Sequence, residues 1–307
     1  MPHFGLLNIH KPPGMTSRRV VDRVVRLVGK KTKVGHAGTL DPLATGVLVL
    51  CLGRATRLIE YVQRMPKRYT GTFLFGRTST TEDIEGEVTE LVDPPVPTRE
   101  SIEQAAQQLV GQIQQRPPAF SALKIDGRRA YDLARRGETP DLKPRTITVH
   151  SIELLSYEYP QFVLDIRCGS GTYVRSLGRD LAESLGTGAV MSALERTAIG
   201  GFRLTCSDRG WQGQASCPWH PAVDLDELTA DNLSEHLHPA LIAVESLPSV
   251  TLTADQYARI ANGQTIGLTD PPDADEIAAL DSVGRLAAIL IPRDNETWRP
   301  LRFFPRD

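Results

Sequence analysis

The chain has 307 residues, of which 40% are hydrophobic and 23% charged, so it can build a sizeable core. Its longest apolar run, residues 47–52, is far shorter than the ~20 residues that span a bilayer, and we find no secretory signal. Four cysteines at irregular spacing suit a reducing cytosol. These features exclude a membrane protein, a fibre and a secreted disulfide-rich protein. We expect a cytoplasmic globular protein of about two domains.

The net charge of −2 hides an uneven distribution of charge along the chain. Residues 1–70 contain 13 Lys or Arg against 3 Asp or Glu, whereas residues 221–290 contain 2 basic and 12 acidic residues. This asymmetry favours a polyanionic partner for the basic part, although an ordinary uneven surface would produce the same count. Residues 116–145, with 8 basic and 4 acidic side chains, are a second candidate contact.

The first third of the chain predicts strands and one helix around a glycine-rich loop. We expect, in chain order, a strand over residues 5–9, a helix from Thr16 or Ser17 to Gly29, a glycine-rich loop over 35–46, a buried strand over 47–52 and a strand over 69–77. The helix is predicted from valines that recur at helical spacing, and the last strand from alternating apolar residues.

The remainder predicts mixed helices and strands that end in a small module. We expect a helix over residues 101–109, then a loop, short strand, turn and helix over 114–138, paired strands over 147–157 and 162–168, a helix from Thr172 or Tyr173 to Leu185, and an insertion-like loop over 206–221. From about residue 247 the pattern changes to a short capped helix followed by a strand pair. We therefore expect a separate module of about 60 residues.

Asp41 is the first candidate for chemistry. It lies in the window GHAGTLDPLATG, where Pro42 keeps it extended and the flanking glycines let a ligand approach the backbone closely. A lone Asp-Pro pair is also common in ordinary turns. The window by itself is therefore compatible with a catalytic aspartate and with a purely structural turn.

Metal and nucleotide cofactors are not indicated. His36 has no second His or Cys at ligand spacing, and the set Cys206, Cys217 and His220 lacks a fourth ligand. No glycine-rich phosphate-binding motif follows a predicted strand. We predict neither a cofactor nor a metal for this protein.

Six separated segments together resemble one family. With the Asp41 window, they are HKPPGMTSRRVVDRV, KRYTGTFLFGRTSTTEDIEG, QRPPAFSALKIDGRRAYDLARRGE, CGSGTYVRSLGRDLAESLGTGA and LERTAIGGF. In this order they resemble the TruB family of pseudouridine synthases over residues 4–202. The resemblance implies an α+β fold with a mixed, mainly antiparallel sheet, flanking helices and a central cleft. We assign residues 1–240, including the loop 206–221, to this catalytic domain and residues 247–307 to a small β-rich PUA-like domain that binds RNA.

The resemblance also implies roles for seven residues. Asp41 matches the catalytic aspartate, and Arg175 matches the arginine that pairs with it. Tyr69 matches the active-site tyrosine that stacks on the uracil and is a candidate for moving the proton from carbon 5, and Tyr173 matches a second pocket tyrosine. His36 matches the histidine that stacks where the target base has left, Lys11 the lysine that braces the catalytic loop, and Leu194 the apolar wall of the pocket. Their patterns alone favour plainer roles: core for Tyr69, a solvated helix face for Arg175, and loop or turn positions for His36 and Lys11.

The implied reaction is isomerisation of the T-loop uridine 55 of tRNA to pseudouridine. The base is flipped out, the bond from ribose to the base nitrogen is broken with the help of the aspartate, and the base is rejoined through ring carbon 5. The expected partner is the T-arm and elbow of tRNA, with the protein a monomer. In the C-terminal module we expect contacts to RNA from arginines only, namely Arg293, Arg299, Arg302 and Arg306.

Two other classes of function remain open at this stage. One is an RNA-binding or RNA-folding protein without catalysis, and the other is a metal-dependent hydrolase. The joint presence of Asp41, Tyr69 and Arg175 favours the enzyme over the first, and the lack of a ligand set disfavours the second.

Overall fold

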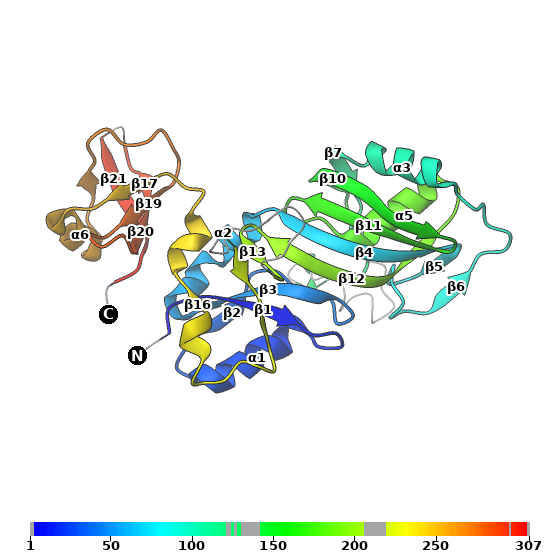
Figure 1. Cartoon of the computed structure of the whole chain (residues 1–307). Helices are drawn as coiled ribbons and strands as arrows, with labels where there is room; N and C mark the ends of the chain where they lie inside the picture. Colours follow the sequence, from blue (N-terminus) through cyan, green and yellow to red (C-terminus); the bar gives the residue numbers. More distant parts are fainter. Residues whose placement is uncertain are drawn as a thin grey trace, which may run out of the picture.

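Two β-sheets organise the molecule. The computed structural model describes residues 3–120, 124–125, 128–129, 142–205, 219–294 and 296–305. Within these residues one sheet has 12 strands, with β15-β1-β3-β12-β4-β11-β10-β7 as its main path, and a second sheet has 5 strands. The small sheet lies at one end of the molecule, beyond the helices next to the N-terminal strands (Figure 1). The predicted α+β fold with a mainly antiparallel sheet is confirmed.

The N-terminal part of the large sheet is formed by β1 (Gly5–Lys11), β2 (Val34–His36) and β3 (Thr45–Leu52), with α1 (Ser17–Val28) packed against it. The predicted helix is confirmed at both ends. The Thr16 hydroxyl accepts a hydrogen bond from the Arg19 amide at 3.2 Å, and Gly29 adopts a φ of 81° just after the helix. The strand β2 was not predicted, because three residues are too few to reveal an alternation.

The other half of the large sheet carries the elements that build the site. These are β4 (Lys67–Phe75), α3 (Arg99–Gln108), β10 (Arg145–Glu158), β11 (Gln161–Cys168), α5 (Val174–Ser184) and β12 (Ala189–Ile199). The predicted strands and helices in this region are confirmed, but β12 was not predicted. Two register shifts along β12 interrupt its alternation, which explains why its sequence did not read as a strand.

Strand β12 joins the two halves of the sheet. It runs parallel to β3 and antiparallel to β4. At its contact with β3, Gly46 has a φ of 102°, and a Cβ there would lie 2.3 Å from the Arg196 carbonyl oxygen. Only glycine allows the two backbones to approach so closely. The loop that carries Asp41 is thereby fixed against the neighbouring strand.

Short elements complete the large part of the molecule. They are η1 (Gly53–Leu58), α2 (Ile59–Arg64), β5 (Arg77–Ser79), β6 (Val88–Glu90), β7 (Gly111–Gln115), β8 (Lys124–Ile125), β9 (Arg128–Arg129), β13 (Phe202–Arg203), β14 (His220–Pro221), β15 (Val223–Asp224), η2 (Leu233–His236), β16 (Leu237–His238) and η3 (Ala240–Val244). The predicted helix before residue 138 and most of the predicted loop 206–221 lie outside the described residues.

The C-terminal sheet is a separate five-stranded layer with one helix. Its elements are β17 (Ser249–Thr251), α6 (Ala254–Ala261), β18 (Ile266–Gly267), β19 (Ile277–Leu280), β20 (Leu286–Pro292) and β21 (Thr297–Phe303). The predicted capped helix and strand pair are confirmed. Thr253 and Gln256 form a reciprocal capping box at the start of α6, and β20 pairs antiparallel with β21.

Tight packing brings α5 close to the sheet. The rings of Phe73, Phe75 and Phe162 stack in the core, with centroids 4.0 and 5.2 Å apart, and burial of each such ring contributes about 1.5–3 kcal/mol. A Cβ at Gly178 of α5 would lie 2.2 Å from the Phe73 ring. The missing side chain at Gly178 therefore sets the helix close to β4, and this fixes where the first turn of α5 meets the cleft.

The two sheets share one hydrophobic cluster. Ala278, Ile289 and Phe304 of the C-terminal part pack with residues of η1 such as Leu58, and the Phe304 ring stacks on Phe4 at 5.7 Å. The C-terminal sheet is therefore packed against the rest of the molecule. Among the described helices, none has the length and apolar character needed to cross a membrane.

Candidate active site

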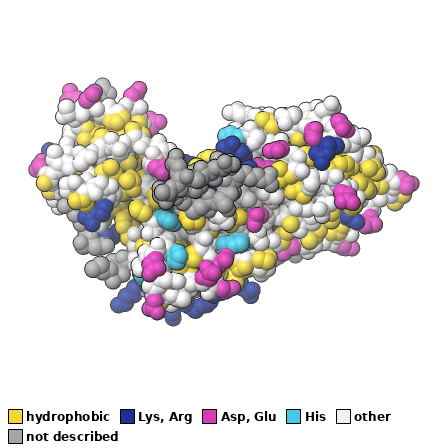
Figure 2. Space-filling model, viewed as in Figure 1, with side chains coloured by type: hydrophobic (Ala, Val, Ile, Leu, Met, Phe, Trp, Pro, Cys, Tyr) yellow, Lys and Arg dark blue, Asp and Glu magenta, His cyan; other side chains and the backbone are white. Residues whose placement is uncertain are grey.

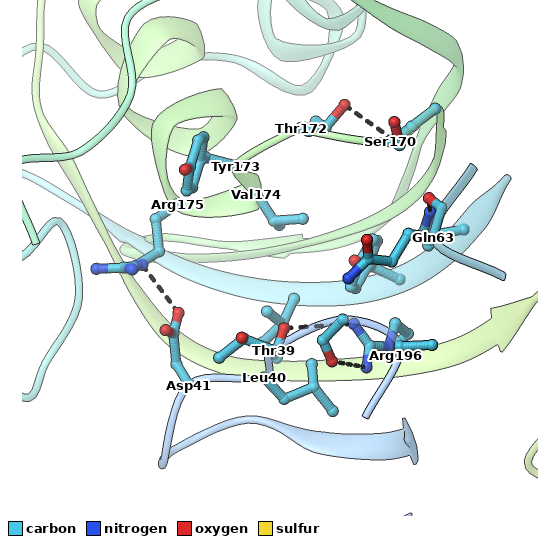
Figure 3. A pocket seen from close by; sticks show the side chains of 17 residues that line it. Thr39, Leu40, Asp41, Gln63, Ser170, Thr172, Tyr173, Val174, Arg175 and Arg196 are labelled. Carbon is cyan, nitrogen blue, oxygen red and sulfur yellow. Dashed lines mark hydrogen bonds and ion pairs between the residues drawn. The ribbon is translucent and has the colours of Figure 1, made fainter. Parts of the chain in front are cut away.

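A cavity of about 410 Å³ opens between the two halves of the large sheet. Its lining comes from the loop before β3, from the end of α2, from β4, from the loop before α5 with the first turn of that helix, and from β12. Figure 3 shows Asp41 and Arg175 on one side of this cavity and Gln63, Ser170 and Thr172 on the other. Asp41, Tyr69, Tyr173, Arg175 and Leu194, five of the seven residues singled out in the sequence, line it.

Asp41 forms an ion pair with Arg175. The Nε atom of Arg175 lies 3.1 Å from a carboxylate oxygen of Asp41. The Asp41 side chain is 33% exposed, whereas that of Arg175 is only 6% exposed, so the carboxylate reaches the cavity and the guanidinium lies behind it. The plainer reading of Arg175, a solvated helix face, is wrong.

The guanidinium of Arg175 is held from several sides. Its two terminal nitrogens donate to the carbonyl oxygens of Thr81 at 2.7 Å and Phe120 at 3.1 Å. The carboxylate of Asp83, itself buried, lies 3.3 Å from one of them. Together these contacts fix the orientation of the guanidinium. Asp83 contacts the site through Arg175 and was not singled out in the sequence, although it lies within a motif segment.

Burial and Arg175 act on Asp41 in opposite directions. Burial raises the pKa of Asp41, the Arg175 guanidinium lowers it, and the carboxylate of Asp83 raises it again. The net result is a pKa above the ordinary value for aspartate. The pairing with Arg175 that the resemblance implied accounts only for the lowering of this pKa, because nothing in the sequence reveals how far the carboxylate is removed from water.

Lys11 braces the loop that carries Asp41. Its ammonium donates to the carbonyl oxygens of Met15 at 2.6 Å and Pro42 at 3.2 Å, and the Gly14 amide donates to the same Pro42 oxygen at 2.8 Å. Burial lowers the pKa of Lys11 to about 8, while Asp41 opposes this shift. Lys11 lies behind the loop and is not among the described lining residues.

Arg196 holds the same loop from the sheet side, and the sequence did not single it out. It is 2% exposed, and its guanidinium donates to the carbonyl oxygens of Gly38 at 3.1 Å, Thr39 at 3.4 Å and Val47 at 2.7 Å. One side chain thus connects both ends of the Asp41 loop. The only signal in the sequence was that Arg196 lies within the motif segment LERTAIGGF.

Tyr69 and its neighbours form the sheet side of the cavity. Tyr69 lies opposite Arg196 in the pairing of β4 with β12. Burial raises the pKa of Tyr69, although Arg196 opposes the shift, so the phenol is protonated at neutral pH. Leu194, two residues before Arg196, adds an apolar wall on the same face.

Tyr173 is fixed by its backbone. The buried Gln115 side chain accepts from the Tyr173 amide at 2.9 Å and donates to its carbonyl oxygen at 3.0 Å, and the Arg145 guanidinium lies 5.5 Å from its ring centroid. The first turn of α5 is thereby pinned to β7. His36 ends β2, opposite Leu50, and is not among the described lining residues.

Two further expectations concern metals and the C-terminal arginines. Within the described residues no group of three or more His, Cys, Asp or Glu is placed to hold a metal ion, and Cys206 and Cys217 lie outside them. Arg302 forms an ion pair with Glu60 and lies 5.3 Å from the Tyr61 ring centroid, so it contacts its own chain. Arg293 and Arg299 are exposed, and Arg306 lies outside the described residues.

Known proteins resemble this chain over nearly its whole length. Residues 26–174 match the model of the family described as TruB family pseudouridylate synthase (N terminal domain). The chain is 36% identical over 340 residues to a tRNA pseudouridine synthase B of Rhodopirellula baltica, covering 98% of this chain and 95% of that one. It is 40% identical over 313 residues to the protein of the same name from Leifsonia xyli subsp. xyli, covering 99% and 97%.

A solved structure shares the fold. One chain in the crystal structure of a Cbf5-Nop10-Gar1 complex superposes with a TM-score of 0.71, over 98% of this chain and 84% of its own length, at 24% identity. Sequence and fold together therefore define a pseudouridine synthase, an isomerase that acts on RNA. Within that class the chain belongs to the TruB family of pseudouridylate synthases.

Proposed function

We propose that this protein isomerises uridine 55 of tRNA to pseudouridine in the cavity described above, with Asp41 as the reacting carboxylate. The observation that carries the proposal is the Asp41–Arg175 ion pair, which faces a cavity between the loop before β3 and the start of α5. The names of the relatives, which share at least 36% of their residues with this chain, supply the substrate.

The cavity suits a single flipped base. A base leaves its stack in folded RNA at a cost of a few kcal/mol, and stacking on an aromatic side chain contributes about 1–3 kcal/mol in return. Tyr69 offers such a ring on the sheet side, and Leu194 is the apolar wall next to it. His36 is proposed to stack in the space that the base leaves, outside the cavity.

Asp41 performs the bond chemistry without a cofactor. A carboxylate can attack the anomeric carbon, attack the base or remove a ribose proton, and each route needs the ionised form. Arg175 keeps that form oriented towards the cavity, while the raised pKa makes the carboxylate a stronger base. When the base rejoins through carbon 5, the proton on that carbon must leave. Asp41 fits this second task better than Tyr69, whose raised pKa keeps its phenol protonated.

Positive charge beside the cleft suits an RNA partner. Seven of the 13 basic residues in 1–70 lie on α1 or in the linker after it, and Figure 2 shows Lys and Arg side chains gathered along that edge of the molecule. Phosphate contacts of this kind weaken as salt rises. We expect the T-arm and elbow of tRNA to lie on this face, with one protein chain sufficient for catalysis. A cytoplasmic location stays a prediction.

Release of tritium from carbon 5 tests this function. An unmodified tRNA transcript labelled at carbon 5 of its uridines is expected to lose the label from position 55 alone, and a transcript with cytidine there is expected to lose none. A protein that only binds or folds RNA would bind the transcript tightly and release no tritium. Release by the Asp41→Asn variant at the wild-type rate would contradict the role of Asp41.

A further inference from the structure

The residues at the end of the cavity opposite Asp41 have no role in the reaction described so far. We call it the distal end, formed by Gln63, Lys67, the loop 169–172 and Arg196. Lys67 and Tyr69 alternate on the same buried face of β4, about 6.6 Å apart along the strand. Lys67 pairs across the sheet with Cys168, directly before the loop 169–172. Tyr69 therefore lies between the distal end and the Asp41–Arg175 pair.

Two buried cations meet at the distal end without an acidic partner. Lys67 is 8% exposed and Arg196 2% exposed. Among the described residues, no carboxylate lies within ion-pair distance of either. Buried charges in proteins are normally paired, because an uncompensated charge is costly to remove from water. Such an arrangement points to a ligand that brings electron-rich atoms.

Lys67 has one donor left for such a ligand. Its ammonium donates to the carbonyl oxygens of Gln63 and of Met65, the latter at 2.6 Å. An ammonium group has three N–H donors, so one is available. Arg196, by contrast, donates to three carbonyl oxygens at the two ends of the Asp41 loop and contributes mainly its charge.

We propose that Lys67 donates a hydrogen bond to a carbonyl oxygen of the target uracil, and that Lys67 and Arg196 together stabilise the negative charge that the base carries while it is detached from the ribose. This inference rests on the proposed function. With the ribose at Asp41 and the ring on Tyr69, a carbonyl oxygen of the base points to the distal end.

The electron balance explains why a cationic end is useful. When the bond between the ribose carbon and the base nitrogen breaks, its electron pair stays on the base and is shared with both carbonyl oxygens. The pair is used again when carbon 5 bonds to the ribose. Carbon 5 then loses its proton to Asp41, and the ring nitrogen that was bound to the ribose takes up a proton, so the product base is neutral. A fixed donor and a nearby guanidinium stabilise the base during the interval between these steps. Cytosine has an amino group in place of one of the two carbonyl oxygens of uracil, and this amino group cannot accept a hydrogen bond from an ammonium. A contact of Lys67 to that position therefore also disfavours cytosine.

The pKa of Lys67 in the absence of RNA agrees with its buried position at the distal end. Burial, with a smaller contribution from Arg196, lowers the pKa of Lys67 to about 8. A lysine is charged below its pKa, so the ammonium is lost as pH rises through about 8. The reaction at limiting low RNA concentration is therefore expected to slow above this pH.

Sulfur substitution in the substrate tests the contact directly. Single-turnover rates are measured with transcripts that carry uridine, 2-thiouridine or 4-thiouridine at the target position, using wild type and Lys67→Met. Sulfur accepts hydrogen bonds poorly, so one thio-substrate should slow the wild type about tenfold. Lys67→Met should react about 10²-fold more slowly with uridine, and its rate should fall no further with that thio-substrate. A thio effect as large in Lys67→Met as in wild type, for both thio-substrates, would overturn the contact.

Two further variants separate this contact from a structural role. Lys31→Met removes an exposed lysine from the basic linker, so it should weaken binding at most and keep the wild-type thio effect. Lys67→Arg keeps a charge that does not titrate in this range. Its decline above pH 8 should therefore be smaller than that of the wild type, and what remains is due to Lys11, whose pKa is also about 8. If Lys67→Met does not fold, this pH profile decides: a decline in Lys67→Arg identical to that of wild type contradicts the proposal. Absence of tritium release by the wild type would instead contradict the proposed function itself.

Discussion

The active-site cavity and the C-terminal sheet use buried charge in opposite ways. Around the cavity, Lys11, Lys67, Asp83, Arg175 and Arg196 are all less than 9% exposed. In the described part of the C-terminal sheet, the only comparably buried charge is Asp281, and the core around it is apolar.

This difference shows where the fold gives up stability for chemistry. Charges around the cavity are removed from water and held by carbonyl oxygens and by one another, an arrangement that costs free energy but fixes their orientation before the substrate arrives. Asp281 instead accepts from the amides of Val283 at 3.0 Å and Arg285 at 2.9 Å within its own turn. Substitutions around the cavity should therefore affect the rate first, and those in the C-terminal turn should affect stability alone.

The largest effect is expected at Asp41. The Asp41→Asn variant should lose about 10³–10⁴-fold in single-turnover rate, because the amide cannot act as a base or nucleophile. Its melting temperature should be equal to or above that of the wild type, since a buried charge is removed while Arg175 keeps Asp83 as a partner. A variant that loses stability in proportion to its rate would contradict the comparison.

The next effect is expected at Arg175, and pH reveals it. The rate requires ionised Asp41, so it is lost as pH falls through the pKa of that carboxyl group, which is already raised. Arg175→Gln removes the main group that lowers this pKa. The acid side of the pH–rate profile should therefore move to higher pH, and the rate at neutral pH should fall about 10²-fold.

Arg179 provides the matched control in the same helix. It pairs with Glu82 and Asp180, and no ion pair joins it to Asp41. Arg179→Gln should leave the acid side of the profile where the wild type has it. An equal displacement in both variants would show that the shift reports general damage to α5.

A smaller effect is expected at Arg196. Lysine in its place keeps the charge but cannot reach the carbonyl oxygens of Gly38, Thr39 and Val47 together. Arg196→Lys should lower the single-turnover rate about 10–10²-fold with little change in tRNA affinity, because a loosened loop displaces Asp41. Glu195→Gln, at the neighbouring position of β12, should leave the rate unchanged. A loss of affinity without a loss of rate would contradict this role.

The smallest effect on catalysis is expected at Asp281. Burial by itself would raise the pKa of Asp281, but hydrogen bonds from the Arg285 and Val283 amides outweigh it and the pKa is lowered. The side chain thus stabilises the fold above the ordinary aspartate pKa, and this contribution is lost as pH falls through the lowered value. Asp281→Ala should reduce the free energy of unfolding by about 1–3 kcal/mol at neutral pH and leave the single-turnover rate unchanged.

Denaturant unfolding at neutral pH and near pH 3 measures this contribution. The difference between Asp281→Ala and wild type should shrink at the acid pH, and Ser282→Ala, an exposed neighbour, should match the wild type at both. A difference that persists unchanged at low pH would mean that the carboxylate charge is not involved.

The parts of the molecule that the sequence predicted are those with a regular local pattern or a motif segment. The helix α1 was predicted with both ends because Thr16, the valines and Gly29 act locally. Strand β12 was not predicted because its bulges break the alternation. Asp41 and Arg175 came from motifs, but Arg175 seemed solvent-exposed, since burial depends on Thr81, Phe120 and Asp83 far along the chain.

The distal end of the cavity could not be predicted for a related reason. Lys67 and Tyr69 differ by two positions and therefore had to share a face if the segment was a strand. Whether that face is solvated or buried depends on Arg196, more than a hundred residues later, and on the loop after Cys168. A single sequence shows the alternation but not the cavity that it lines.

A structure of the Asp41→Asn variant bound to T-arm RNA tests the central claim most directly. The account predicts that uridine 55 is turned out of its loop, with the ribose beside residue 41, the ring on Tyr69 and a carbonyl oxygen directed at Lys67. A complex in which this uridine remains stacked within the T-loop while the cavity is empty, or in which the RNA lies away from the cavity, would contradict it.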